Sequence, residues 1–366
     1  MSDMEYRKLK TLAKYPTGKL NSNAAVEDGK YPFFTCAHEI YRIDQYSYDG
    51  EYVLLGGNNA SGDFPIFYYN GKFDAYQRTY LIQPLSKDTD TKYLYYSIGL
   101  KLHQMKANAS GTATKFLTQP ILNNINIEYR NIEEQKRIAD ILSTYDNLIE
   151  NNNKRIKLLE QMAENLYKEW FVRFRFPGYE DVEFLDGFPK EWKICRTDQL
   201  SKIKAGGDAP DDATKEITDK CSIPIYSNGI ENEGLYGYTS KAKINKPSIT
   251  ISARGTVGYT CLRRVSYTPI VRLICIIPHE EKLANWLFYY FKRTIVTANG
   301  TSQQQITIPM MSREKVLLPT NDLIQKFYEY STCYLDEIDS LKAQNSNLEK
   351  QRDMLLPRLM SGKIEV

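Results

Sequence analysis

The chain has 366 residues, of which 42% are hydrophobic and 25% charged, and its formal net charge is +3. That length exceeds one ordinary domain core and fits two or three domains of ordinary globular composition. No stretch approaches the roughly 20 apolar residues of a membrane span, and no apolar signal core follows the charged N-terminus, so we expect a cytoplasmic protein without membrane contact.

Residues 1–132 form the first predicted module, of mixed α/β character. Short β-prone runs punctuated by Gly-Asn, Asn-Gly and Ser-Gly pairs predict strands, and an amphipathic helix is expected at about 91–107. A Gly-Thr loop and a short strand containing Phe116 and Leu117 follow. The other strands are expected at 52–55, 66–69 and 79–83.

A long helix is predicted for residues 133–176, because apolar residues recur there every seven positions in two interleaved columns. Pro177 and Gly178 then break the helix. The second module, 177–320, repeats the first: strands are expected at 248–252, 257–262 and 270–277, a helix at 281–297, then a Gly-Thr loop and a short strand at Ile306. A second heptad helix occupies 321–366.

One offset relates the two halves. Adding 189 carries Gly111 onto Gly300 and Pro120 onto Pro309. The sequence therefore predicts an α+β fold built by tandem duplication, in which two mixed α/β modules are separated by two long antiparallel coiled-coil helices. Two independent amphipathic helices, each lying on its own module, remain the alternative. The predicted seam residues are Leu142, Tyr145, Ile149, Asn152, Ile156, Leu159 and Leu166 on the first helix, and Tyr334, Ile338, Leu341, Leu348 and Leu355 on the second.

Charge alternates along the chain. Residues 1–132, 133–182, 183–320 and 321–366 carry +2, −2, +5 and −2. No acidic residue lies between Glu233 and Glu280, where seven basic residues fall: Lys241, Lys243, Lys246, Arg254, Arg263, Arg264 and Arg272. Such a surface suits a polyanion, although a solvated face with acids folded back from elsewhere is also possible.

Catalytic and metal-binding motifs are not found. The three histidines are not spaced as a metal pair, the six cysteines include no CxxC, and no phosphate-binding GxxxxGK[ST] or Asp/Asn-Pro-Pro-aromatic tetrapeptide occurs. We expect neither a metal nor a cofactor in this chain. A nuclease or solitary methyltransferase is therefore a weak hypothesis.

Candidate DNA contacts fall instead on loops and basic positions. The two Gly-Thr loops occupy one place in each repeat, and Arg254 lies on a glycine-rich hairpin from which an arginine can read guanine. The candidates are Asn58, Asn59, Arg78, Gly111, Thr112, Thr114 and Lys115 in the first module, and Asn228, Lys241, Lys243, Arg254, Thr256, Gly300, Thr301, Ser302, Gln303, Gln304 and Gln305 in the second.

The order of these features resembles the specificity subunit of type I restriction-modification systems. The resemblance covers the whole chain and is carried by FPKEW, the central helix IEEQKRIADILSTYDNLIENNNKRIKLLEQMAENLYKEWF, ISARGTVG, NGTSQQQI and the tail LEKQRDMLLPRLMSGKIEV. It implies a non-catalytic subunit with a target-recognition domain at 1–132, a helix at 133–176, a second recognition domain at 177–320 and a distal helix at 321–366.

The resemblance also implies function and partners. Each recognition domain would read one half of a bipartite, asymmetric site in double-stranded DNA, and the helices would set the gap. Two methyltransferase subunits and then restriction subunits would assemble around the chain, and S-adenosylmethionine, ATP and Mg²⁺ would belong to those partners. In the first module LLGGNNASGD replaces the arginine-containing hairpin, so Asn58, Asn59 and Lys115 are expected to read that half-site. A coiled-coil protein-interaction adaptor without specific DNA binding is the rival interpretation.

Overall fold

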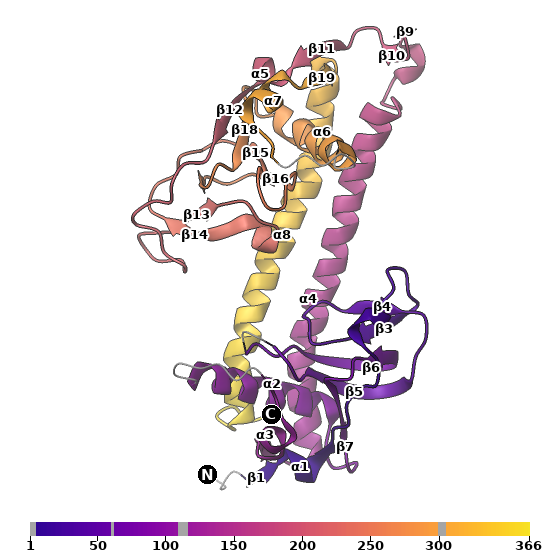
Figure 1. Ribbon diagram of the computed structural model, residues 1–366, viewed down its shortest axis with the longest axis vertical. Helices are drawn as coiled ribbons and strands as arrows, with labels where there is room; N and C mark the ends of the chain where they lie inside the picture. The colour runs from indigo at the N-terminus through magenta and orange to yellow at the C-terminus, as the bar shows by residue number, and fades with distance from the viewer. Residues whose placement is uncertain (1–4, 60–61, 109–115, 299–304) are drawn as a thin grey trace. The chain divides into compact units, whose positions relative to one another are not determined.

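A computed structural model describes residues 5–59, 62–108, 116–298 and 305–366 (Figure 1). The chain forms two compact units: the first joins Met1–Asn153 to Lys342–Val366, and the second is Lys154–Leu341. Each unit holds one sheet-containing module and a part of each long helix, α4 (Ile132–Tyr167) and α8 (Asn321–Met360). Among the described residues, no helix is both long and apolar enough to cross a membrane.

A six-stranded sheet forms the module of the first unit, in the order β2-β7-β5-β6-β3-β4. Only β3 and β6 pair in parallel. Helix α2 (Thr91–Asn108) lies against β5 and β6, because Val53 and Leu55, two residues apart on β5, point to one face and share a core with Leu94 of the helix. The strands are β2 (Ala13–Lys14), β3 (Tyr31–Phe34), β4 (Tyr41–Ile43), β5 (Tyr48–Gly56), β6 (Ile66–Ala75) and β7 (Thr79–Pro84).

The module of the second unit divides its strands between a four-stranded sheet, β12-β18-β15-β16, and a three-stranded sheet, β14-β13-β17. Helix α6 (Leu283–Ala298) covers the larger sheet, and its Trp286 shares a core with Ile249 and Ile276. These strands are β12 (Ser201–Ala205), β13 (Ile223–Tyr226), β14 (Leu235–Thr239), β15 (Ser248–Ile251), β16 (Thr260–Arg263), β17 (Thr268–Pro269) and β18 (Ile274–Pro278).

Short elements at the edges of both modules repeat in the same order, which confirms the duplication. Each module begins with a strand and a one-turn helix and ends with a second short helix and a closing strand. In the first module these are β1 (Glu5–Lys8), α1 (Leu9–Leu12), α3 (Gln119–Asn123) and β8 (Asn126–Tyr129). In the second they are β11 (Lys193–Arg196), α5 (Thr197–Leu200), α7 (Ile308–Arg313) and β19 (Lys315–Leu318). β1 pairs with β8, and β11 with β19, both antiparallel. The linker before the second module holds a short 3₁₀ helix, Tyr179–Asp181, and the hairpin of β9 (Phe184–Leu185) and β10 (Phe188–Pro189).

Four strand predictions were wrong in detail. The expected strand 270–277 is interrupted by a turn, because Val271 and Arg272 have φ of 52° and 59°, and the expected strand 257–262 begins only at Thr260. No strand element forms at Phe116–Leu117 or at Ile306: Phe116 makes only an isolated bridge. The prolines that follow start the short helices α3 and α7 instead, since proline fits the first turn of a helix.

The long helices run antiparallel within each unit, as predicted. In the first unit Leu142 near the start of α4 shares a core with Leu359 and Met360 at the end of α8. In the second unit Ala163 and Tyr167 near the end of α4 share a core with Phe327 near the start of α8. After Tyr167 the helix continues as a π-helical turn, Lys168–Val172.

Every predicted seam residue is withdrawn from solvent to some extent. Leu142, Asn152, Ile338 and Leu341 are buried, and Tyr145, Ile149, Ile156, Leu159, Leu166, Tyr334, Leu348 and Leu355 are half-buried. The seam of the first unit contains a polar layer: Asn152 Nδ2 donates to Asn345 Oδ1 at 2.9 Å, and Asn345 Nδ2 donates to Asn153 Oδ1 at 2.9 Å. In the second unit Arg155 pairs with Glu337 at 2.6 Å.

Candidate nucleic-acid interface

The β15–β16 hairpin of the second unit presents Arg254 at its tip. Ser252 N donates to Tyr259 O at 2.9 Å and Gly258 N donates to Ser252 O at 2.8 Å, which closes the loop. Gly255 adopts a φ of +69°, a conformation that glycine tolerates best. Arg254 and Thr256, both predicted DNA contacts, are exposed on this loop.

Asn228 holds the hairpin in place. Its Oδ1 accepts from Ala253 N at 2.8 Å, and its Nδ2 donates to Val271 O at 2.6 Å. The side chain therefore ties the base of the hairpin to the turn before β18. Both ends of its amide thus have a backbone partner, which gives Asn228 a supporting role, and its predicted DNA contact stays a prediction.

The second Gly-Thr loop ends beside the same hairpin. Ile306 is buried and its N–H donates to Ala253 O at 3.4 Å, so the exposed Gln305 lies next to the hairpin base. The other predicted loop contacts lie outside the described residues: Gly111, Thr112, Thr114 and Lys115 in the first loop, and Gly300, Thr301, Ser302, Gln303 and Gln304 in the second.

Fewer basic side chains of the second module are free at the surface than the run of seven in the sequence predicted. Arg263 is only 3% exposed; its guanidinium lies 3.6 Å from the Tyr226 ring centroid and 3.3 Å from a Glu233 carboxylate oxygen. Arg264 pairs with Asp336 and Asp339 of α8. These two arginines have internal roles, and their predicted place in a polyanion-binding surface was wrong.

Five basic side chains of that run stay available. They are exposed and make no ion pair with any residue that the structure describes: Lys241, Lys243, Lys246, Arg254 and Arg272. Asp212 fixes the segment in front of Lys241, because its carboxylate accepts from Ser240 N at 2.9 Å and from Thr239 Oγ1 at 2.6 Å. Hydrogen bonds from Ser240 and Thr239 lower the pKa of the Asp212 carboxyl well below its usual range.

The first unit brings its predicted contacts together in a similar way. Gly57 N donates to Arg78 O at 2.8 Å, and Leu117 N donates to Gly57 O at 2.9 Å. Asn58 bridges Phe116, the first described residue after the Gly-Thr loop. Arg78 is exposed, whereas Asn58 and Asn59 are half-buried. The strand end at Asn58, the turn at Arg78 and the end of the loop therefore meet at one place.

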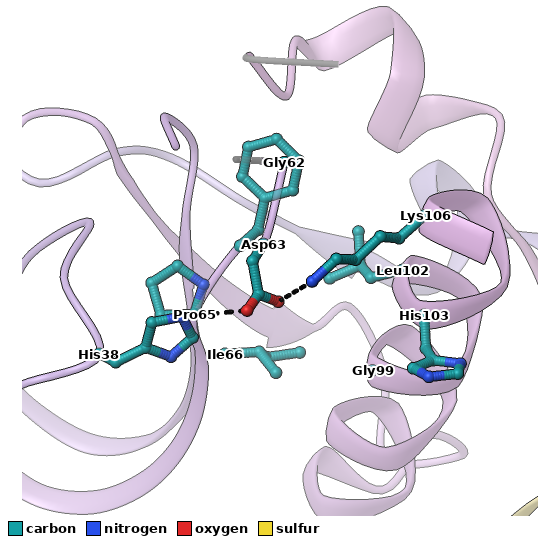
Figure 2. Close-up of a pocket in the computed structure, with 10 residues that line it drawn as sticks. His38, Gly62, Asp63, Pro65, Ile66, Gly99, Leu102, His103 and Lys106 are labelled. Carbon is teal, nitrogen blue, oxygen red and sulfur yellow. Dashed lines mark ion pairs between the residues drawn. The ribbon is translucent and has the colours of Figure 1, made fainter. Parts of the chain in front are cut away.

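A pocket of about 540 Å³ lies beside this place in the first unit (Figure 2). Asp63 points between His38 and Lys106, with His38 Nε2 3.6 Å from Asp63 Oδ2 and Lys106 Nζ 3.3 Å from Asp63 Oδ1. All three side chains are about half exposed, so these pairs add little stability. Their effect is to tie Asp63 to the end of α2 through Lys106 and to the segment after β3 through His38.

Neither this pocket nor any other described part of the chain presents a metal-binding set: no group of three or more His, Cys, Asp or Glu side chains could hold an ion there. What the structure assembles in each unit is a hairpin or strand end, a turn and a loop end with exposed basic or amide side chains. This combination suits contact with the phosphates and base edges of a nucleic acid.

Comparison with known proteins gives a consistent family. Residues 1–161 and 189–350 each match the type I restriction modification DNA specificity domain. A type I specificity subunit from Mycoplasma pneumoniae is 31% identical over 298 residues, which is 80% of this chain and 78% of that protein. The specificity subunit of the EcoDI type I restriction enzyme from Escherichia coli is 32% identical over 57% of this chain and 52% of its own length.

A solved structure has the same fold. The S subunit of a type I restriction-modification system from M. genitalium superposes with a TM-score of 0.63 at 18% identity, and the match covers 98% of this chain and 97% of that one.

Proposed function

Because this chain belongs to the family of type I restriction-modification DNA specificity subunits, we propose that each of its two modules reads one half of a bipartite, asymmetric target in double-stranded DNA. The chain gives specificity and catalyses nothing by itself. Methylation and ATP-dependent cleavage belong to partner subunits, which bring S-adenosylmethionine, ATP and Mg²⁺. We expect it to act in the cytoplasm, where those subunits and DNA meet.

The observation that carries this proposal is the repeated cluster of strand end, turn and loop end. Each module builds the cluster from equivalent elements, yet fills it with different side chains: Asn58 and Asn59 in the first, Arg254 and Gln305 in the second. Equivalent frames with different contact residues are what two half-sites of different sequence require, because base edges are distinguished by their donor and acceptor patterns.

The outer face of α4 supports docking of methyltransferase subunits. Four apolar side chains on this helix remain between 37% and 59% exposed, namely Ile141, Leu148, Leu158 and Met162. They alternate with charged positions such as Lys157 and Glu160. Apolar residues exposed along a helix beside charges are typical of a surface that another helix covers. We assign the exposed pair in each unit, Ile141 with Leu148 and Leu158 with Met162, to one methyltransferase subunit, and expect the restriction subunits to join these.

Methylation mapping tests the proposal. The chain is expressed with the methyltransferase subunit of its own system in a host that lacks other methylation, and the genome is sequenced for modified adenine. We expect one bipartite motif with unequal halves that disappears when this chain is omitted. Methylation that persists without the chain, or a motif with a single half, would contradict the proposal. A chain that copurifies with the methyltransferase subunit but directs no methylated motif would leave only the adaptor role.

A further inference from the structure

Arg78 and Arg272 occupy equivalent turns in the two modules. In both, a two-residue turn follows a bridging residue and precedes a central strand: residues 77–78 come before β7, and residues 271–272 come before β18. The strand on the other side of each turn also corresponds, because β3 pairs in parallel with β6 and β13 pairs in parallel with β17.

Four backbone hydrogen bonds have the same arrangement around the two turns. In the first module they are Tyr76 N to Phe34 O at 2.9 Å, Gln77 N to Leu20 O at 2.8 Å, Thr79 N to Tyr76 O at 2.8 Å and Gly18 N to Thr79 O at 2.9 Å. In the second they are Ile270 N to Tyr226 O at 2.9 Å, Val271 N to Gly207 O at 2.8 Å, Leu273 N to Ile270 O at 3.1 Å and Gly206 N to Leu273 O at 2.9 Å. This register places Arg272 at the position of Arg78.

A glycine fixes each turn against the preceding segment. A Cβ on Gly18 would lie 2.3 Å from Ala75 O, and a Cβ on Gly206 would lie 2.6 Å from Ile270 N. Both contacts are with backbone, which cannot move aside as a flexible side chain can. Matching backbone contacts therefore hold the two turns, although the turns differ in conformation: φ is 52° at Val271 and 59° at Arg272, whereas Gln77 and Arg78 are not among the described residues with positive φ.

Both arginine side chains are exposed and have no hydrogen bond or ion pair with the residues that the structure describes. Nearby arginines do have such partners, as Arg263 and Arg264 show. Each turn also touches its recognition cluster: Gly57 N donates to Arg78 O, and Asn228 Nδ2 donates to Val271 O, next to Arg272. A cation without an internal partner thus stands beside each cluster.

We propose that Arg78 and Arg272 bind the sugar-phosphate backbone of the two half-sites and contribute affinity without reading sequence. The inference rests on the proposed function. Its reason is that the arginine recurs at one position while the neighbouring contact residues differ between modules. A residue common to two modules that read different bases fits the part of DNA that both half-sites share, and that part is the phosphate backbone.

The test uses the full chain in complex with its methyltransferase subunit and a fluorescent duplex of random sequence. Binding is measured over a salt series for the wild type, Arg78→Ala, Arg272→Ala and the two Arg→Lys variants. The logarithm of the affinity falls as the logarithm of the salt concentration rises. Each alanine variant should make the slope of this line less steep by about 0.9, and each lysine variant should keep the wild-type slope. Arg358→Ala, at an exposed position of α8, removes the same charge elsewhere and should leave the slope unchanged.

Methylation mapping of the same variants provides the second readout. Arg78→Ala and Arg272→Ala should lower the extent of methylation while leaving every specified base of the motif unchanged. An unchanged salt slope, a slope that falls equally in Arg358→Ala, or a relaxed base position in either alanine variant would overturn the inference. A wild-type complex that neither binds duplex DNA nor methylates a bipartite motif would instead refute the proposed function.

Discussion

The buried amide pair between α4 and α8 gives a sharp stability prediction. Asn152 and Asn345 are 5% and 8% exposed and share a 2.9 Å hydrogen bond. Asn345→Ala leaves Asn152 Nδ2 without its partner, and Asn152→Ala leaves Asn345 Oδ1 without its donor. Asn153, the other partner of Asn345, is exposed and can turn to water. Each single variant therefore leaves one buried polar group unpaired.

The magnitude follows from two opposing terms. An unpaired buried amide costs about 1–3 kcal/mol, whereas alanine in a helix gains up to about 0.7 kcal/mol over asparagine. The net loss for each single variant is about 0.3–3 kcal/mol of the free energy of unfolding, which lowers the melting temperature by about 1–12 °C for a unit of this size. The double variant leaves no unpaired amide, so it should lose less than the sum of the singles, with a coupling of about 0.5–3 kcal/mol.

Thermal and urea denaturation followed by circular dichroism completes the cycle. Asn151→Ala is the matched control, because Asn151 lies on the exposed face of the same helix and its substitution reports the helix-propensity gain alone. Strict additivity in the double variant would refute the reasoning, and so would single variants that are as stable as the Asn151→Ala control.

Three further predictions concern DNA reading, backbone fit and pH. Arg254→Ala should relax recognition in one half of the methylated motif only, at about 1–3 kcal/mol per lost base contact; relaxation in both halves would be inconsistent with one module per half-site. Gly206→Ala should lower the melting temperature because its Cβ meets backbone at 2.6 Å, whereas Gly207→Ala, whose Cβ meets only a lysine end at 3.9 Å, should not. Burial raises the pKa of Tyr93 and Tyr290 to about 12. The folded state is therefore stabilised by the neutral phenols below about pH 10, and this stabilisation is lost as the pH rises toward about 12. The melting temperature should fall between these pH values, and a flat profile would argue against the burial of the two side chains.

Periodic features of the sequence predicted the fold well. The heptad columns identified both long helices, because the seven-residue spacing of the buried positions does not depend on the residues at the exposed positions. The offset of 189 identified the duplicated module. Strand ends were predicted less well. Val271 and Arg272 lie in a β-prone run, and tertiary hydrogen bonds to Gly206, Gly207 and Asn228 hold them in a turn. Long-range backbone pairing of this kind leaves no local signal.

The candidate interface was predicted in part. The sequence pointed to the hairpin with Arg254 and to the neighbouring loop, and the structure brings the hairpin together with the loop end at Gln305. It also pointed to Arg264, whose acidic partners Asp336 and Asp339 lie more than 70 residues away in the chain. Local charge counts cannot detect such pairing. The equivalence of Arg78 and Arg272 was missed because loop insertions shift their spacing away from 189.

The division of the chain into units has a consequence for its synthesis on the ribosome. The second unit, Lys154–Leu341, is continuous and has all its core residues before α8 is complete. The first unit begins the chain but needs Leu359 and Met360, which pack on Leu142. The residues of the first module are therefore translated before the segment that completes their core, and their apolar surface waits until Leu359 and Met360 have been made. Chaperone contacts during synthesis should consequently concentrate on the first module.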